Sequence, residues 1–107
     1  MKYPEIITRL AKIKSLPNGV DGFLLQGKET QLVFFDFNEE TTIPPHSHGA
    51  QWGIVVDGEI MLTISGVEKK YQKGDSYFIP DGAVHSGITS AGFKAIDFFG
   101  QADRYRI

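Results

Sequence analysis

The sequence contains no cysteine among its 107 residues. This absence excludes disulfide bridges, thiolate catalysis and cysteine-based zinc sites together. No uncharged apolar run approaches the roughly 20 residues that a membrane-spanning helix needs. The N-terminal residues also lack the apolar stretch of a secretory signal peptide. These absences leave a soluble, cytoplasmic protein as the expectation, with no membrane among its partners.

Positive charge is scarce and scattered. Lysine and arginine contribute 11 residues against 13 aspartate and glutamate residues, for a formal net charge of −2. The densest basic group consists of Lys69, Lys70 and Lys73, which is typical of a solvated turn or strand edge. A nucleic-acid-binding protein would carry a basic patch or stripe. We therefore expect no nucleic acid among the partners.

Apolar residues are plentiful, at 41% of the chain, and 12% of the residues are aromatic. The twelve glycines and five prolines divide the chain into short segments of alternating apolar character, a pattern typical of an all-β sandwich or barrel. No linker or internal repeat interrupts it, so residues 1–107 are expected to form one domain. The pattern predicts strands over residues 31–37, 51–56, 60–64, 77–79, 85–89 and 93–99. Turns are predicted at Asp57-Gly58, Ser65-Gly66 and Pro80-Asp81-Gly82.

Only the first fifteen residues depart from the strand pattern. Pro4-Glu5 is a helix-start signal. Ile6, Leu10 and Ile13 follow it with helical spacing, which predicts a helix of about two turns. The β-branched residues at the start of this segment also suit a strand, so a short N-terminal strand is the alternative.

The three histidines are the strongest candidates for a chemical site. His46 and His48 are one residue apart, and such residues face the same side of a strand. Pro44-Pro45 disfavours a helix just before them. His85 follows a predicted turn and opens another strand, from which it can reach the same place. Imidazole binds Zn, Cu, Ni and Fe, although a bare pair of alternating histidines is more often an ordinary surface feature.

The wider spacing resembles the two sequence motifs of the cupin superfamily. The first motif has two histidines one residue apart, a short gap, a glutamate, six residues and a glycine. Its positions are occupied here by His46, His48, Gln51 and Gly58. The second motif is Gly, five residues, Pro, one residue, Gly, two residues and His. Its positions are occupied by Gly74, Pro80, Gly82 and His85. The first motif spans residues 45–59 and the second spans residues 74–89.

The resemblance implies an all-β fold, a small jelly-roll barrel that forms a single cupin-like domain over residues 1–107. It also implies a homodimer, because cupins of this short kind commonly pair. One divalent transition metal is expected per chain, with Zn, Ni, Fe, Cu and Mn all open. The metal ligands that the motifs imply are His46, His48, Gln51 and His85.

Gln51 is the departure that bears on chemistry, since it stands in the glutamate position. The gap between His48 and Gln51 is also one residue shorter than usual. Two further departures, Glu40 for a glycine and Thr89 for an asparagine, concern structure. A glutamine offers a metal only a neutral carbonyl oxygen. The metal would then keep its full charge and attract anions, and the site would lose a possible general base. Alternatively, Gln51 lies outside the ligand set and orients a substrate or a bound water.

Two functions fit these features, and no catalytic residue is identified. The first is a metal-dependent enzyme of the dioxygenase, isomerase or decarboxylase type, acting on a small polar or carboxylate substrate. The second is a non-catalytic module that binds or senses a small ligand in the barrel. A third possibility is a degenerate barrel whose histidines bind no metal. The fold does not choose among them, because one fold hosts many functions.

Some aromatic and acidic residues suit either the core or a pocket. Trp52 is expected to face away from Gln51 and to pack in the core or in an interface. Phe34, Phe78 and Phe98 are expected in the core rather than in a cavity wall. Asp97 is either an outward-facing surface residue or an acceptor for an imidazole N–H, and we expect the surface position.

Overall fold

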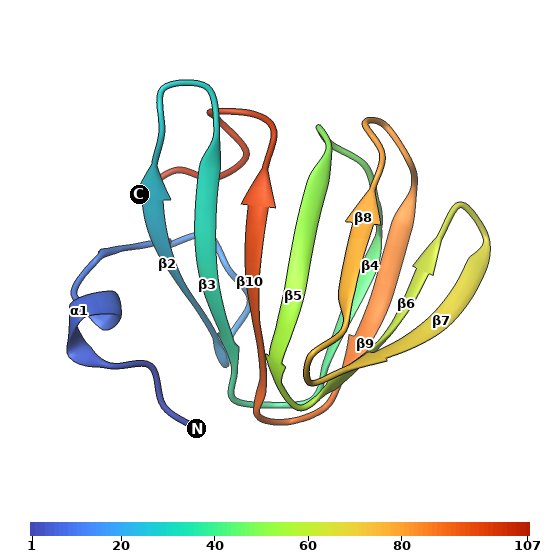
Figure 1. Cartoon of the computed structure of the whole chain (residues 1–107), viewed down its shortest axis with the longest axis horizontal. Coiled ribbons are helices and arrows are strands. Elements are labelled where there is room, and N and C mark those ends of the chain that lie inside the picture. The colour runs from blue at the N-terminus through green and yellow to red at the C-terminus, as the bar shows by residue number, and fades with distance from the viewer.

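The structure, a computed structural model, describes all of residues 1–107. It consists almost entirely of antiparallel strands in two sheets (Figure 1). The six-stranded sheet has the order β1-β2-β3-β10-β5-β8, and the four-stranded sheet has the order β4-β9-β6-β7. This arrangement confirms the expected all-β jelly-roll fold. No helix is long and apolar enough to cross a membrane.

The elements follow one another along the chain with short connections. They are α1 (Glu5–Thr8), β1 (Ala11–Lys12), β2 (Val20–Gln26), β3 (Gln31–Phe37), β4 (Thr41–His46), β5 (Gln51–Asp57), β6 (Glu59–Ile64), β7 (Val67–Gln72), β8 (Ser76–Ile79), β9 (His85–Thr89) and β10 (Phe93–Phe99). Glycines with positive φ mark several turns, among them Gly58 between β5 and β6. Glycine adopts this conformation at little steric cost.

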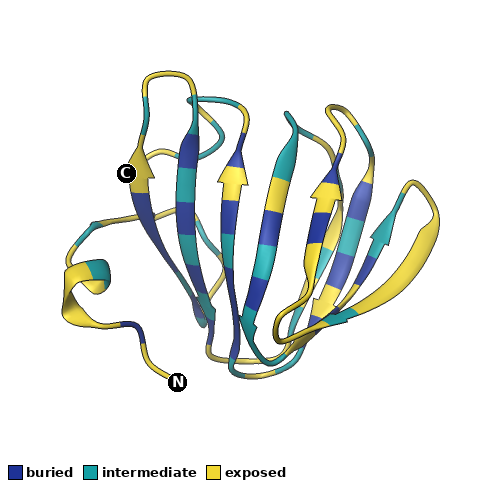
Figure 2. Cartoon of the chain, viewed as in Figure 1, coloured by how far each residue is buried: buried dark blue, intermediate teal, exposed yellow.

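The core lies between the two sheets and draws on both. Side chains of a strand alternate between its faces, and β3 follows this rule, with buried and half-buried residues in strict alternation (Figure 2). Fourteen buried apolar residues form one continuous cluster. Its most enclosed members, Val33, Val55, Ala95 and Phe99, are at most 1% exposed. Burial of apolar surface at about 25 cal/mol per Å² is the main stabilising contribution of such a cluster.

Most strands lie where the sequence pattern predicts them. The predicted bounds of β3, β9 and β10 are confirmed, and those of β5, β6 and β8 differ by one residue at one end. β1, β2, β4 and β7 were not among the predicted ranges. β7 is an edge strand that is exposed along almost its whole length. Its polar sequence therefore carries no apolar alternation from which a strand can be predicted.

The N-terminal segment contains both a helix and a strand, and each is short. α1 begins directly after Pro4, as predicted, but it contains four residues instead of two turns. Ile6 is 68% exposed. Ile6, Leu10 and Ile13 therefore do not form a buried stripe on a helix. An isolated helix of this length gains little stability from its own hydrogen bonds. The chain instead extends into β1, which pairs with β2.

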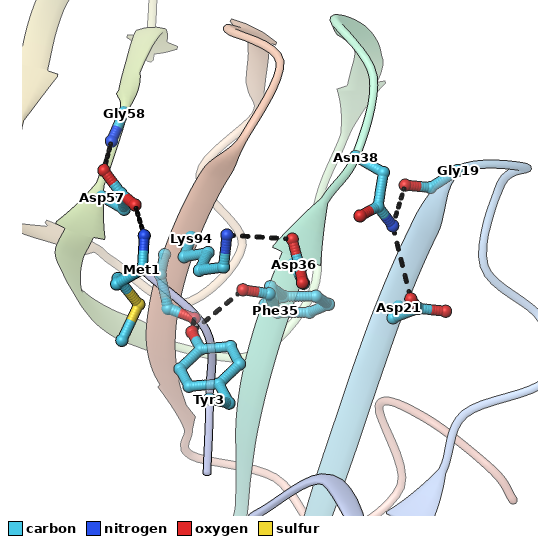
Figure 3. A network of polar contacts seen from close by, with 11 residues as sticks. Met1, Tyr3, Gly19, Asp21, Phe35, Asp36, Asn38, Asp57, Gly58 and Lys94 are labelled. Carbon is cyan, nitrogen blue, oxygen red and sulfur yellow. Dashed lines mark hydrogen bonds and ion pairs between the residues drawn. The ribbon is translucent and has the colours of Figure 1, made fainter.

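Polar contacts fasten the N-terminal residues to the large sheet (Figure 3). The amino group of Met1 lies 2.7 Å from the Asp57 carboxylate, and the hydroxyl of Tyr3 donates to the Phe35 carbonyl at 3.0 Å. Burial raises the pKa of Tyr3, so this hydroxyl stays a donor at neutral pH. Nearby on the same sheet, the buried Lys94 ammonium lies 3.4 Å from the Asp36 carboxylate. None of these four charged groups lines the cavity described below.

Candidate metal centre

A cavity of about 310 Å³ lies inside the barrel and is lined by residues of both sheets. Apolar side chains such as Phe35, Ile60 and Leu62 form much of its wall. A small group of polar side chains converges on the same space. It includes His46, His48, Gln51, Tyr77, His85, Asp97 and Arg104. An apolar cavity of this size with a few convergent polar groups is typical of a small-molecule site.

His46 and His85 are brought together by strand pairing. His46 is the last residue of β4, His85 is the first of β9, and the two are register partners. The pairing shifts between Ile43 and His46, so Pro44-Pro45 form an irregularity in β4. β4 is an edge strand, and edge strands tolerate prolines because one side needs no backbone donor. The centres of the two imidazole rings lie 4.1 Å apart.

His48 joins them from a loop. The prediction that it shares a strand with His46 is wrong, because β4 ends at His46. Two hydrogen bonds hold this loop: the Gly82 N–H donates to the His48 carbonyl at 2.9 Å, and the Gly49 N–H donates to the side-chain oxygen of Gln101 at 2.6 Å. The ring centre of His48 lies 5.2 Å from that of His46 and 4.8 Å from that of His85.

Each imidazole is oriented by a contact between its Nδ1 and a backbone carbonyl. The acceptors are the carbonyls of Pro44 for His46, Gly49 for His48 and Ala83 for His85, at 2.8–2.9 Å. A carbonyl only accepts, so Nδ1 must carry the proton and Nε2 keeps its lone pair. Backbone carbonyls commonly fix metal-ligating histidines in this way. All three rings are therefore set to bind through Nε2.

The cavity also keeps the imidazoles of His48 and His85 uncharged. Burial lowers the pKa of His48 to about 4 and lowers the pKa of His85. The hydrogen bond to a backbone carbonyl opposes the shift in each ring, and the proximity of Arg104 and His46 reinforces it in both. Both rings are therefore neutral at pH 7, which is the form that binds a metal.

The distances fit a single metal ion. One ring nitrogen of each histidine lies within 4.8 Å of the corresponding nitrogens of the other two. A tetrahedral ion that holds each nitrogen at about 2.1 Å requires them to lie about 3.4 Å apart. Binding of an ion would therefore require the rings to rotate so that these nitrogens approach one another. Neutral imidazole nitrogens suit Zn, Cu, Ni or Fe and do not suit Mg or Ca, so the three histidines can hold one divalent transition metal.

Gln51 lies in the same cavity, as expected, at the first position of β5. Its side-chain Nε2 donates a hydrogen bond to the Asp97 carboxylate at 2.8 Å. The NH₂ group of an amide only donates, so only Oε1 of Gln51 can act as a metal ligand. Ligation through that oxygen stays a prediction.

Asp97 is buried, with 2% of its surface exposed, so the predicted surface position is wrong. It does not accept a hydrogen bond from an imidazole either. Its donors are the Tyr77 hydroxyl at 2.7 Å and the Gln51 amide at 2.8 Å. Burial raises the pKa of Asp97 to about 6, although both hydrogen bonds lower it. Its role in the site is to contact Gln51 rather than a histidine.

Arg104 is a cavity residue that no sequence motif indicated. Its guanidinium lies 4.5 Å from the centre of the Tyr105 ring, and its Nε is buried without a hydrogen-bond partner. The guanidinium forms no ion pair with a carboxylate of the protein. The side chain of Gln31 holds this C-terminal segment in place by bonding to both the N–H and the carbonyl of Tyr105. The cavity therefore contains a cation that lacks a protein anion.

Several aromatic residues do not lie in the core, where they were predicted. Phe78 and Phe98 are 59% and 43% exposed, and Phe34 is half-buried. None of these three lines the cavity, and none belongs to the buried core. Trp52 faces away from Gln51, as expected, but it is 44% exposed. The aromatic residues that do line the cavity are Phe35, Phe37, Tyr77, Phe93 and Tyr105.

Comparisons with known proteins agree with this fold. A protein-family model described as a cupin domain matches residues 33–95. A comparison with curated proteins gives no match. The solved structure of an RmlC-like cupin from Shewanella frigidimarina NCIMB 400 has a TM-score of 0.80 and 26% identity, over 91% of this chain and 88% of that chain.

Two further structures share the fold at lower identity. KdgF from Halomonas sp. has a TM-score of 0.73 and 19% identity, over 85% of this chain and 87% of that chain. Oxalate decarboxylase from Bacillus subtilis, which contains Mn(II) centres, has a TM-score of 0.76 and 17% identity. That match covers 91% of this chain but only 29% of the larger enzyme.

Proposed function

Because the chain belongs to the cupin family, we propose that it is a metal-dependent enzyme acting on a small carboxylate-bearing molecule inside the barrel. The observation that carries this proposal is the convergence of three histidines, each with Nε2 free, in a cavity that also contains an unpaired arginine. Even with Gln51 as a fourth protein ligand, a five- or six-coordinate ion keeps positions open for a substrate. Oxalate decarboxylase, a manganese enzyme with this fold, supports the proposal because oxalate is also a small carboxylate.

In this proposal the metal ligands are the Nε2 atoms of His46, His48 and His85 and the Oε1 atom of Gln51. The metal is one of Zn, Ni, Fe, Cu or Mn, at one ion per chain. When bound, such an ion supplies a Lewis acid that polarises a substrate oxygen. Because every ligand is neutral, the site keeps a positive charge that favours an anionic substrate. The protein's own residues then decide which anion fits.

Arg104 supports a carboxylate as the bound group. A guanidinium presents its donors in a planar fork that matches a carboxylate, and no protein carboxylate occupies this one. Arg104 lines the same cavity as His48 and His85, and its charge contributes to lowering their pKa values. One substrate can therefore contact Arg104 and the metal centre together. The cavity of about 310 Å³ limits that substrate to a small molecule.

The proposal is tested by turnover of a panel of small carboxylates, such as keto acids, hydroxy acids and dicarboxylic acids. The protein is prepared without a metal-affinity tag, stripped with a chelator and reloaded with each of the five metals in turn. We expect one substrate class to be consumed, with activity lost on stripping and restored by one or two metals. Carboxylate binding without turnover under any metal would instead identify a binding module, and the enzyme proposal would be wrong.

We also propose that two copies of the chain pair through the outer face of the large sheet. Five apolar residues on adjacent strands are register partners and form one row across this sheet. They are Leu25, Leu32, Phe98, Trp52 and Phe78. Four of the five are between 43% and 59% exposed, and the fifth, Leu32, is half-buried. An apolar row of this extent is unusual on the surface of a monomer, and a twofold dimer covers such a face with its own copy.

The dimer predicts a response to charge at the centre of the row. Wild type is expected to have twice the chain mass of 11.9 kDa by light scattering, and Trp52→Glu is expected to have the monomer mass. Val67→Glu is the matched control, because Val67 is 71% exposed and lies on β7 of the other sheet. A monomeric wild type, or a Trp52→Glu variant that stays dimeric, would contradict this interface.

A further inference from the structure

A buried polar cluster lies beside Gln51 on the large sheet. Asp97 on β10, Gly53 on β5 and Tyr77 on β8 are register partners in one row. A Cβ atom added at Gly53 would collide with the Asp97 carboxylate and the Tyr77 ring. The missing side chain thus leaves the space in which the Tyr77 hydroxyl reaches Asp97 at 2.7 Å. Glycine weakens a strand interior, and where it occurs there it commonly marks such a close approach.

We propose that Asp97 is a positioning residue that fixes the amide of Gln51 and excludes a carboxylate from position 51. This inference rests on the proposed metal site, because the orientation of Gln51 matters only if its oxygen serves that site. Asp97 contacts none of the imidazoles and acts through Gln51 alone among the proposed ligands. The two hydrogen bonds that it accepts come from two neighbouring strands on one side of β10, one from β5 and one from β8.

The chemistry of the two side chains sets the orientation. An ionised carboxylate only accepts hydrogen bonds, so Gln51 must turn its NH₂ group toward Asp97. The amide oxygen is then the atom left for the metal centre. The single proton of the Tyr77 hydroxyl is already donated to the same carboxylate oxygen of Asp97. Tyr77 therefore has no proton left to donate to another acidic group.

A glutamate at position 51 would lose this hydrogen bond and add a like charge. Two carboxylates would then lie about one hydrogen-bond length apart in a buried place, where they cannot both ionise without strong repulsion. The charge at residue 97 therefore determines which residue type is tolerated at 51. If Asp97 becomes Asn, its amide can donate to a carboxylate at 51, and the conflict is removed.

A double-mutant cycle tests this coupling with Gln51→Glu, Asp97→Asn and the combined variant. The first readout is thermal unfolding of the metal-free protein. The second is affinity for Zn²⁺ and Mn²⁺, measured by competition with a chelator. We expect Gln51→Glu alone to lower the unfolding temperature by several degrees and to weaken metal binding about tenfold or more. The combined variant is expected to regain the unfolding temperature and to bind metal at least as tightly as wild type, since the glutamate introduced at position 51 then adds an anionic ligand.

A charge-matched control separates this contact from a general effect of net charge. Asp81→Asn removes one negative charge at an exposed turn, and it should not rescue Gln51→Glu. If Gln51→Glu has the same effect with Asp or Asn at 97 in both readouts, the inference is wrong. Tighter metal binding by Gln51→Glu in the presence of Asp97 would also overturn it. If wild type binds no metal, the proposed function fails, whereas the unfolding cycle still tests the contact.

Discussion

Replacing His85 with glutamine is expected to remove the metal, so that occupancy falls from about one ion per chain to near zero. His85 is the most enclosed of the three histidines, at 5% exposed, and its ring lies within 5 Å of both others. Loss of a residue that only orients a metal ligand typically costs 10–100-fold in affinity. Loss of a ligand itself should cost about 100-fold or more. Elemental analysis of tag-free protein and chelator competition measure the effect.

Ser86→Ala provides the control for this experiment. Ser86 is the next residue on β9 and also lines the cavity, but it is not among the proposed ligands. It should keep a full complement of metal. Circular dichroism should show the same strand content in both variants. Full metal occupancy in folded His85→Gln protein would contradict the three-histidine site.

Replacing Arg104 with glutamine is expected to weaken the binding of small carboxylates about 10- to 100-fold without loss of metal. A hydrogen bond to a charged group contributes about 1.5–3 kcal/mol, and Arg104 forms no ion pair with a carboxylate of the protein. Arg104→Lys should restore part of the affinity, because lysine keeps the charge but not the planar fork. Titration calorimetry of metal-loaded protein with acetate, pyruvate and oxalate measures the change.

Arg106 supplies the control, because it is exposed and does not line the cavity. Arg106→Gln removes the same charge two residues away and should leave carboxylate affinity unchanged. A second readout needs no ligand: because the charge of Arg104 helps to lower the pKa of His48, Arg104→Gln should raise that pKa in a magnetic-resonance titration of the metal-free protein. Equal losses of affinity in both variants would mean that only net charge attracts the anion.

The histidine cluster was predictable because the spacing of the motif residues depends on the strands and turns that bring them together. His46 and His85 meet as register partners in adjacent strands, and Gln51 reaches the cavity from the start of β5. His48 reaches the cluster from a loop, not from the strand face on which the prediction depended. The spacing was therefore a better guide than the local geometry inferred from it.

Asp97 and Arg104 were not predictable, because their environments depend on distant parts of the chain. Asp97 is buried since β10 lies between β3 and β5, and its donors are 20 and 46 residues away. Arg104 reaches the cavity because Gln31, on β3, fastens the C-terminal segment. Neither position follows from residues that are neighbours in sequence.

The aromatic residues were misplaced for a different reason. Alternation in a strand shows which residues share a face, but it identifies the inner face only when the other face is polar. β10 and β5 are apolar on both faces, so Phe98 and Trp52 look like core residues in sequence. In the structure they belong to the exposed row on the large sheet.

The most direct test of the metal centre is anomalous diffraction from crystals of the metal-loaded protein. We expect one anomalous peak per chain, with the Nε2 atoms of His46, His48 and His85 at about 2.0–2.2 Å from it. The Oε1 atom of Gln51 should be the fourth protein ligand, while its Nε2 still faces Asp97. No peak at the three histidines, or one coordinated through Nδ1, would contradict the site.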